Sequence, residues 1–432
     1  MRMKFLKSSQ LALVSAASLA AAALITACGT LTTDFVFVTS ALSAGTNSYG
    51  QIDVFEINSE SGYMRQIPTS PFPSGGRDPV AEAVSADQYN LYVVNEDDNS
   101  IVQFAIGNDG KVYPQNTVNT PGIYPLAIAV NGTNLFVVDT YQPLPACSTA
   151  APCSGSIGVL PITIGSGSPP SDPPGPNSIP NGDLTYWPLC LTGYTYTTAT
   201  STWNCTGTES DVIVPTAVNV LASGADVFVT AYDSTVSPNV GYVFGFTVGA
   251  GGALTPFGGL PHNMGVGSRG LGIRPSAIAS DSTSTYVFVT DSTNGIVVSY
   301  SVASGVLTNI GDTPTGNAPS AIVADPVYPY LYVANSEDST VTAYSMSSGA
   351  LTNLGNYATG LQPIALGIDP STNHFLFTAN FLGNGTVGSV SGFELSPTAG
   401  TLINSEDSPF TSNAQPTAVA AIPHNTPATS SK

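Results

Sequence analysis

The sequence predicts an all-β fold in which seven four-stranded sheets close into a ring, a seven-bladed β-propeller. Three observations predict it: one strand signature recurs seven times, a second signature also recurs seven times, and the two follow a fixed order along the chain. A chain of 432 residues would have room for about three ordinary domains. A fixed repeat is the stronger signal, and it favours one large array.

The first signature is a short run of β-branched, aromatic and aliphatic residues that ends, in most copies, at an Asn or Asp. Such a run is typical of a strand covered on both faces and followed by an Asx turn. The seven copies lie at 35–40, 91–95, 135–139, 227–231, 287–291, 331–335 and 376–380.

The second signature is Pro, any residue, Ala and then mostly apolar residues. Pro can begin a strand because it needs no ladder partner there, and the small Ala lets neighbouring backbones approach each other. The seven copies lie at 79–84, 125–130, 215–220, 275–280, 319–324, 363–368 and 416–421.

The order of the signatures predicts how the ring closes. The chain begins with a first-signature strand at 35–40 and ends with a second-signature strand at 416–421, so each end lacks what the other supplies. If the last strand completes the first blade, no open sheet edge remains. We therefore expect the propeller to span 35–423, with 424–432 as a disordered tail.

Each unit also carries a third strand and a turn into a fourth, outer strand. The turn is nearly repeated as Ser-Gly-Val-Leu-Thr-Asn-Ile at 304–310 and Ser-Gly-Ala-Leu-Thr-Asn-Leu at 348–354. Two Pro-to-Pro intervals of 44 residues, from Pro275 to Pro319 and from Pro319 to Pro363, match the usual size of a four-stranded blade.

A long interval separates Pro125 from Pro215, and residues 164–211 within it carry neither signature, so we interpret them as an insertion. Its first part is a linker rich in Pro, Gly and Ser. Its second part holds both tryptophans, Trp187 and Trp203. They could form an aromatic platform that binds a sugar or protein partner. We favour the alternative, a flap whose aromatic residues form its own small core.

Five cysteines fall into two groups. Cys28 follows a positively charged start and an apolar stretch, and Ile-Thr-Ala-Cys at 25–28 resembles the lipobox of a bacterial lipoprotein. The resemblance implies a leader at 1–27, lipidation of Cys28, a tether at 28–34 and a place in the cell envelope. Gly29 points to the outer membrane. The alternative is an uncleaved membrane anchor at 8–27.

The other four cysteines lie in or near the insertion. An even number in an exported chain predicts two disulfides, and proximity favours Cys147–Cys153 and Cys190–Cys205. A zinc site is the alternative, but the chain has no Cys-x-x-Cys. We predict no metal site in this region.

The chain has 28 acidic residues, 9 Lys and Arg, and a formal charge of −19. Such a surface repels phosphate backbones, so we exclude nucleic acid as a partner. We expect no cofactor, although a divalent cation such as calcium stays open at acidic loops 96–98 and 337–338. Neither loop follows a calcium-loop spacing, and polar hairpins explain both.

The three strand and turn patterns together resemble the seven-bladed propellers of the lactonase-like group and surface proteins with Tyr-Val-Thr-Asn repeats. The resemblance covers residues 35–423 apart from the insertion. It implies a 6-phosphogluconolactonase-like hydrolase as one activity, although propellers host many unrelated functions. Members of the group commonly carry His directly after the Pro of the second signature. This chain has Val80, Leu126, Thr216, Ser276, Ser320, Ile364 and Thr417 there.

Candidate catalytic residues lie where loops lead into the innermost strands, at one mouth of the predicted channel. Glu82 is a carboxylate at a position that is apolar in the other six copies. Arg77, Arg269 and Arg274 precede such strands, and His262 lies slightly upstream. The arginines could bind a carboxylate or polarise a lactone carbonyl, and Glu82 or His262 could act as general base.

A structural alternative is that Glu82 pairs with Arg77 and that the other arginines clamp neighbouring blades. Two functions therefore compete. The first is a monomeric, lipid-anchored scaffold at the cell surface that binds a protein, glycan or small ligand through its channel mouth or its flap. The second is a lactone hydrolase with a Glu and Arg site at the channel.

Overall fold

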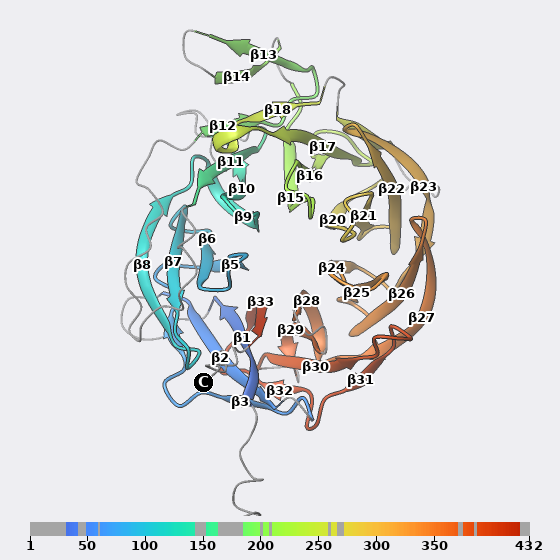
Figure 1. Cartoon of the computed structure of the whole chain (residues 1–432). Coiled ribbons are helices and arrows are strands. Elements are labelled where there is room, and N and C mark those ends of the chain that lie inside the picture. Colours follow the sequence, from blue (N-terminus) through green and yellow to red (C-terminus); the bar gives the residue numbers. More distant parts are fainter. Residues whose placement is uncertain are drawn as a thin grey trace, which may run out of the picture.

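The computed structural model describes residues 32–41, 49–58, 61–142, 153–162, 185–198, 202–206, 210–257, 261–265, 272–369, 375–383 and 387–423. Within them the chain forms seven antiparallel sheets of four or five strands around a central channel, and one separate two-stranded hairpin (Figure 1). The predicted seven-bladed propeller is confirmed. The predicted leader, Cys28, Cys147, Arg269 and the tail lie outside the described residues.

Blades are numbered here from one to seven, and the strands of each run from the channel outward in chain order. Blade two comprises β5 (Pro79–Val84), β6 (Asn90–Asn95), β7 (Ser100–Ile106) and β8 (Val112–Asn119). Blade five comprises β20 (Pro275–Ser280), β21 (Tyr286–Asp291), β22 (Ile296–Ala303) and β23 (Val306–Pro314). Blade six comprises β24 (Pro319–Ala324), β25 (Tyr330–Asn335), β26 (Thr340–Ser347) and β27 (Ala350–Ala358).

In two other blades the outermost strand is split into two short pieces. Blade four comprises β15 (Ile213–Val220), β16 (Asp226–Asp233), β17 (Val240–Val248), β18 (Leu254–Pro256) and β19 (His262–Gly265). Blade seven comprises β28 (Leu361–Ile368), β29 (Phe375–Gly383), β30 (Ser389–Leu395), β31 (Leu402–Asn404) and β32 (Phe410–Thr411).

Blade one closes the ring and also has a split outermost strand. It comprises β1 (Thr32–Ser40), β2 (Gln51–Asn58), β3 (Met64–Gln66), β4 (Phe72–Pro73) and the C-terminal β33 (Pro416–Pro423). β33 pairs with β1, with Ala420 opposite Phe37. It also contacts the innermost strands β5 and β28 of the two neighbouring blades. The predicted closure is therefore confirmed, and no blade is left with an unpaired seam.

Blade three corrects one prediction about the insertion. It comprises β9 (Ile123–Val130), β10 (Asn134–Tyr141), β11 (Ser156–Pro161) and β12 (Thr185–Pro188). β12 lies inside the predicted insertion, yet it pairs with β11 as the fourth strand of the blade. The separate hairpin of β13 (Tyr194–Thr197) and β14 (Thr202–Cys205) projects from the rim of the ring (Figure 1).

The core lies between blades because each sheet is apolar on both faces. Phe288 of blade five, for example, packs in one cluster with Leu331 and Tyr344 of blade six, and all three are buried. Burial of such side chains stabilises the ring by about 2 kcal/mol each. The first-signature strands are thus covered on both faces, as predicted, because each sheet packs against its neighbouring sheets.

The residue after the Pro of the second signature lies in a β-bulge in every blade. A bulge turns this side chain out of the ladder register. Three of these residues use a hydroxyl to donate a hydrogen bond to the carbonyl of the Pro that begins the next blade: Ser276 to Pro319, Ser320 to Pro363 and Thr417 to Pro79. At these three positions the residue after the Pro therefore makes a hydrogen bond between blades.

The Asn or Asp that ends the second strand holds the loop that leads into the innermost strand of the same blade, termed here the approach loop. Asn335 Oδ1 accepts a hydrogen bond of 3.0 Å from the Gly316 amide. Asp139 Oδ2 accepts one of 3.1 Å from the Gly122 amide. The Asn or Asp at this position thus has a structural role in these blades, because it fixes the backbone of the approach loop.

Helical structure is almost absent from the part of the chain that is described. The 3-10 turn η1 (Ala250–Gly252) is the helix found there. None of the described segments forms a helix with the length and apolar character needed to cross a membrane.

Candidate functional site

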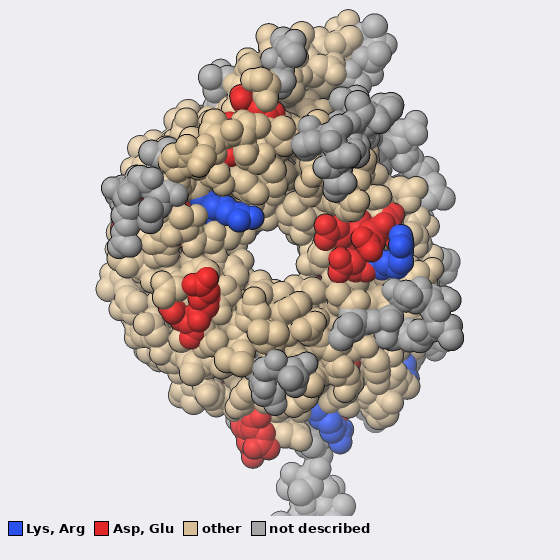
Figure 2. Space-filling model, turned by 180° about the vertical axis from the view of Figure 1, so that it is seen from behind, with Lys and Arg blue, Asp and Glu red and all other residues tan. Residues whose placement is uncertain are grey.

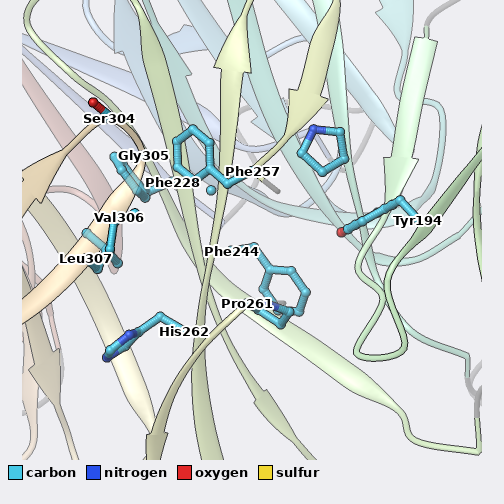
Figure 3. A pocket seen from close by; sticks show the side chains of 12 residues that line it. Tyr194, Phe228, Phe244, Phe257, Pro261, His262, Ser304, Gly305, Val306 and Leu307 are labelled. Carbon is cyan, nitrogen blue, oxygen red and sulfur yellow. The ribbon is translucent and has the colours of Figure 1, made fainter. Parts of the chain in front are cut away.

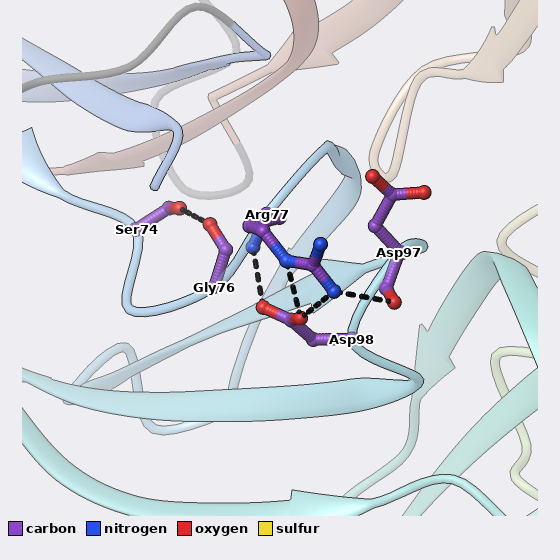
Figure 4. Close-up of polar contacts among 5 residues, drawn as sticks. All are labelled: Ser74, Gly76, Arg77, Asp97 and Asp98. Atoms are coloured by element: carbon purple, nitrogen blue, oxygen red, sulfur yellow. Dashed lines mark hydrogen bonds and ion pairs between the residues drawn. The ribbon is translucent and has the colours of Figure 1, made fainter. Parts of the chain in front are cut away.

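Approach loops and the hairpins between second and third strands lie at the same end of each blade, so their charged residues meet at one mouth of the channel. Arg77, in the approach loop of blade two, forms an ion pair of 2.6 Å with Asp98 of the β6–β7 hairpin. Its backbone amide and Nε donate hydrogen bonds of 2.7 Å to the two oxygens of the same carboxylate (Figure 4). Arg77 is therefore a loop clamp, although its side chain is half exposed.

The charges around this clamp shift one another's pKa values. The hydrogen bond and charge of Asp98 raise the pKa of Arg77. Burial acts to raise the pKa of Asp98, but the contacts with Arg77 outweigh it, so the pKa of Asp98 is lowered. Burial and then the charge of Asp97 raise the pKa of Asp78. In blade two the Arg77 guanidinium thus partly neutralises the acidic loop that carries Asp98.

Glu82 does not pair with Arg77, so that structural alternative is wrong. Both carboxylate oxygens of Glu82 are buried and make no hydrogen bond with another protein group. Burial raises the pKa of Glu82 well above its ordinary value, and the nearby Ala420 amide of β33 offsets this only in part. Burial of this kind favours the protonated carboxyl and withdraws it from solvent, which is unfavourable for a general base.

Arg274 is a second exposed arginine at the channel mouth. It lies in the approach loop of blade five, and its guanidinium carbon is 5.0 Å from the centre of the Tyr232 ring of blade four. Its Nη2 is 3.5 Å from the Tyr232 hydroxyl. The predicted clamp between neighbouring blades is observed here. Among the described residues, no carboxylate forms an ion pair with Arg274.

The charge distribution around the opening is uneven. Figure 2 shows acidic side chains on two opposite sides of the central opening and a basic side chain that reaches its rim. Because the chain carries a formal charge of −19, an uncompensated guanidinium beside the channel is a local exception. It is the natural attachment point for a single anionic group.

His262 was predicted to share this mouth, and that prediction is wrong. His262 begins β19, which pairs with the third strand β17 and therefore lies on the outer side of blade four. Its ring meets the Tyr300 ring edge to face, with centroids 4.9 Å apart. Burial lowers the pKa of His262. The sequence placed it near Arg274, but the strand between them runs along the rim of the blade.

The predicted aromatic platform divides into two unrelated parts. Trp187 lies on β12 and is 3% exposed in the core between blades three and four. Trp203 lies on the hairpin β13–β14, where it packs against Tyr194 and Tyr196. The Cys190–Cys205 disulfide ties the base of this hairpin, as predicted, with sulfurs 2.08 Å apart. Cys153 is also disulfide-bonded, and its predicted pairing with Cys147 stays a prediction.

A cavity of about 440 Å³ opens on the outer side of the ring between blades four and five. Phe228 and Phe244, which are buried, line its inner side, and Phe257, His262 and Tyr194 surround it (Figure 3). The turn at 304–307 of blade five closes it from the opposite wall. No sequence pattern predicted this cavity, which lies beside the two short outer strands β18 and β19.

No metal centre emerges from the described ranges. They contain no group of three or more His, Cys, Asp or Glu side chains that could hold a metal ion. The acidic loops of blades two and six serve other contacts: Asp98 binds Arg77, and Asp338 accepts hydrogen bonds from the Asn317 amide and side chain.

Comparisons agree with this architecture. The sequence model of the family described as "Lactonase, 7-bladed beta-propeller" matches residues 41–143 and 261–368. With the seven closed blades, this match confirms the predicted lactonase-like seven-bladed propeller. The matched segments leave out the insertion and most of blade four. No curated protein matches the chain significantly.

Several solved structures share the fold. A putative 6-phosphogluconolactonase from Bacteroides fragilis is similar with a TM-score of 0.63 and 20% identity, over 91% of this chain and 99% of that one. A putative 6-phosphogluconolactonase from Bacteroides uniformis is similar with a TM-score of 0.66 and 17% identity, over 90% of this chain and 99% of that one. The periplasmic gluconolactonase of Pseudomonas aeruginosa is similar with a TM-score of 0.64 and 16% identity, over 90% of this chain and 98% of that one. At these identities the similarity shows the fold alone.

Proposed function

We propose that this protein is a lipid-anchored propeller of the cell envelope that binds a small carboxylate-bearing ligand at the channel mouth. The observation that carries the proposal is the contrast between two arginines. Arg77 is held by Asp98, whereas Arg274 stands over the Tyr232 ring and has no carboxylate partner among the described residues. The aromatic ring orients the guanidinium and leaves donors for a ligand.

Binding is tested by titration calorimetry with gluconate, a small sugar acid, at low ionic strength. We expect Arg274→Gln to weaken binding at least about tenfold, because a hydrogen bond to a charged group contributes about 1.5–3 kcal/mol. The matched control is Arg77→Gln, which removes a cation of the same mouth that is already neutralised by Asp98. Equal affinities in wild type and Arg274→Gln would contradict the proposal, as would no binding by the wild type.

Lactone hydrolysis is the second candidate, favoured by the family match and by the gluconolactonases among the similar structures. In such a reaction, water attacks the carbonyl carbon, the ring C–O bond breaks, and the acid is released with its hydroxyl group. Arg274 could stabilise the developing oxyanion. The burial of the Glu82 carboxyl, which raises its pKa, speaks against Glu82 as the base that takes the proton from water.

A hydrolysis assay with gluconolactone separates the two candidates. An enzyme predicts turnover that falls at least about a hundredfold in Arg274→Gln, since one oxyanion donor contributes about 10²–10³ in rate. Loss of activity in Glu82→Gln as well would restore Glu82 as the base. Gluconate binding without turnover supports the binding protein.

The lipid anchor rests on the sequence alone, on the run that ends at Cys28. Mass spectrometry of the protein purified from a bacterial membrane tests it directly. We expect an N-terminus at Cys28 with an added acylated glyceryl group, whereas a Cys28→Ser variant should keep its leader. An intact Met1 in the wild type would contradict the anchor.

A further inference from the structure

The cavity between blades four and five differs from the corresponding seam of the next two blades in one respect. Blade five has a continuous outermost strand, β23, and its Ile310 lies against Gly349 of the turn in blade six. A Cβ added to Gly349 would lie 2.3 Å from the Ile310 Cδ1, so that seam is filled. In blade four the outermost strand consists of two short pieces, β18 and β19, and an aromatic ring meets the facing turn instead: a Cβ added to Gly305 would lie 2.6 Å from the Phe257 Cδ1.

The walls of the cavity are aromatic and uncharged. None of the described residues that line it is Lys, Arg, Asp or Glu, in a chain with 28 acidic residues. The polar groups at its edge are the Tyr194 hydroxyl, the Ser304 hydroxyl and the His262 imidazole (Figure 3). Neutral polar groups around aromatic walls suit a ligand that has hydroxyl groups and a flat apolar face.

The flap continues these aromatic walls away from the cavity. Tyr194 and Tyr196 are two residues apart on β13 and therefore share one face, and Trp203 lies opposite Tyr196 on β14. The Tyr194 ring packs edge to face on Phe246 of blade four, with centroids 6.1 Å apart. The Tyr196 side chain is 47% exposed. The aromatic surface thus extends from the cavity to the tip of the hairpin, which the Cys190–Cys205 disulfide holds at its base.

We propose that this cavity and the adjoining face of the flap bind a neutral oligosaccharide. One sugar ring occupies the cavity against Phe257 and Tyr194, and the next ring lies towards Tyr196. The C–H face of a sugar packs on aromatic rings, while its hydroxyl groups meet the polar edge. The lack of charge among the described lining residues distinguishes this site from the Arg274 site at the channel mouth. Either binding proposal can therefore be refuted while the other stands.

The test is titration calorimetry of the purified full-length protein with maltotriose, cellotriose and triacetylchitotriose. Val306 is 63% exposed at the edge of the cavity. We expect Val306→Glu to weaken binding of the preferred trisaccharide at least about tenfold, since it places a charge beside a desolvated apolar ring. Ala350→Glu is the matched control, because Ala350 is the corresponding exposed residue of the same turn in blade six. It should leave binding unchanged.

A second variant probes the flap. Tyr196→Ala should weaken the trisaccharide about tenfold or more, as one aromatic stacking partner is lost, and should leave binding of the corresponding monosaccharide unchanged. The proposal is overturned if none of the three trisaccharides binds, or if Val306→Glu and wild type bind equally. It is also overturned if an acidic saccharide such as trigalacturonate binds more tightly, or if only an apolar dye binds.

Discussion

Asp139 of blade three and Asp291 of blade five occupy the same place in the repeat, yet their surroundings differ. Asp291 Oδ1 accepts hydrogen bonds from the Arg274 and Thr293 amides, and Oδ2 accepts one from the Asn294 side chain. Asp139 Oδ2 accepts one from Gly122, while its Oδ1 is buried without a partner. Burial raises the pKa of Asp139 to about 7. The repeat fixes the position of the carboxylate, and local donors decide how many hydrogen bonds it accepts.

A similar difference in side-chain chemistry separates the innermost strands of blades five and six from that of blade two. Blades five and six keep the repeat, with a hydroxyl after the Pro and an apolar residue three positions after it, as in Ser276 with Ile278 and Ser320 with Ile322. Blade two instead has Val80 and the buried Glu82. We therefore expect stability to depend on pH at two buried carboxyl groups, those of Asp139 and Glu82. Three substitutions test this comparison.

Asp139→Asn should have the largest effect. The folded pKa of about 7 lies above the unfolded value of 3.8, so the protonated form is favoured in the fold. Wild-type stability is then fully present below pH 4 and is lost as the pH rises to about 7. The loss is at most about 4 kcal/mol. Asn occupies this position in blades two, six and seven and can still accept the Gly122 bond, so the variant should gain that stability at pH 8.

Urea unfolding at pH 5 and pH 8 measures this effect, with Asp291→Asn as the matched control. The control should gain nothing, because the Asp291 carboxylate already has donors on both oxygens. Identical pH dependence in wild type and Asp139→Asn would show that Asp139 ionises freely in the fold.

Glu82→Leu should rank second. It places the residue of blade seven, Leu366, at the same position of blade two and removes a buried carboxyl that has no partner, which costs about 2 kcal/mol. The folded pKa of Glu82 is raised above the unfolded 4.5, so the wild type loses stability as the pH rises from there. The gain in the variant should therefore be larger at pH 8 than at pH 5.

Unfolding free energies of Glu82→Leu and of the reverse change, Leu366→Glu, provide the measurement and its control. The reverse change should destabilise blade seven. A loss of stability in Glu82→Leu would mean that the carboxyl makes a favourable contact.

Ser320→Ala should have the smallest effect. The Ser320 hydroxyl donates a hydrogen bond of 2.7 Å to the Pro363 carbonyl of the next blade, and its loss should cost about 1 kcal/mol. Ser210 is exposed, and within the described part of the chain its hydroxyl hydrogen-bonds only to its neighbour Asp211, so Ser210→Ala serves as control. If both variants unfold at the same urea concentration, the hydroxyl contributes nothing to the contact between blades.

The sequence was sufficient for the ring and its closure, because both depend on signatures that every blade repeats. It failed where a strand has no signature. β12 has only four residues, so its role in blade three could not be recognised inside a long insertion. The split of the outermost strand into β18 and β19 was also hidden, and with it the cavity.

Site residues were predicted less well, since pairing depends on neighbours that are distant in sequence. Arg77 and Asp98 are 21 residues apart and meet because an approach loop and a hairpin lie at the same end of a sheet. That end could have been predicted from strand order. The contact of Arg274 with Tyr232 of the preceding blade could not, because the sequence does not fix the rotamer of an exposed side chain. His262 was misplaced for a different reason, since short sequence separation does not keep two residues on the same side of a blade.

The closing strand pair also determines how the ring would carry mechanical load. β1 lies between β2 and β33, with hydrogen bonds to both. A pull along the chain from the N-terminal side of Thr32 therefore acts on two ladders at once and in shear, so that many bonds must break together. The point where a surface tether would join the propeller is thus held on both sides, and tension there would be shared by the first and last segments of the ring.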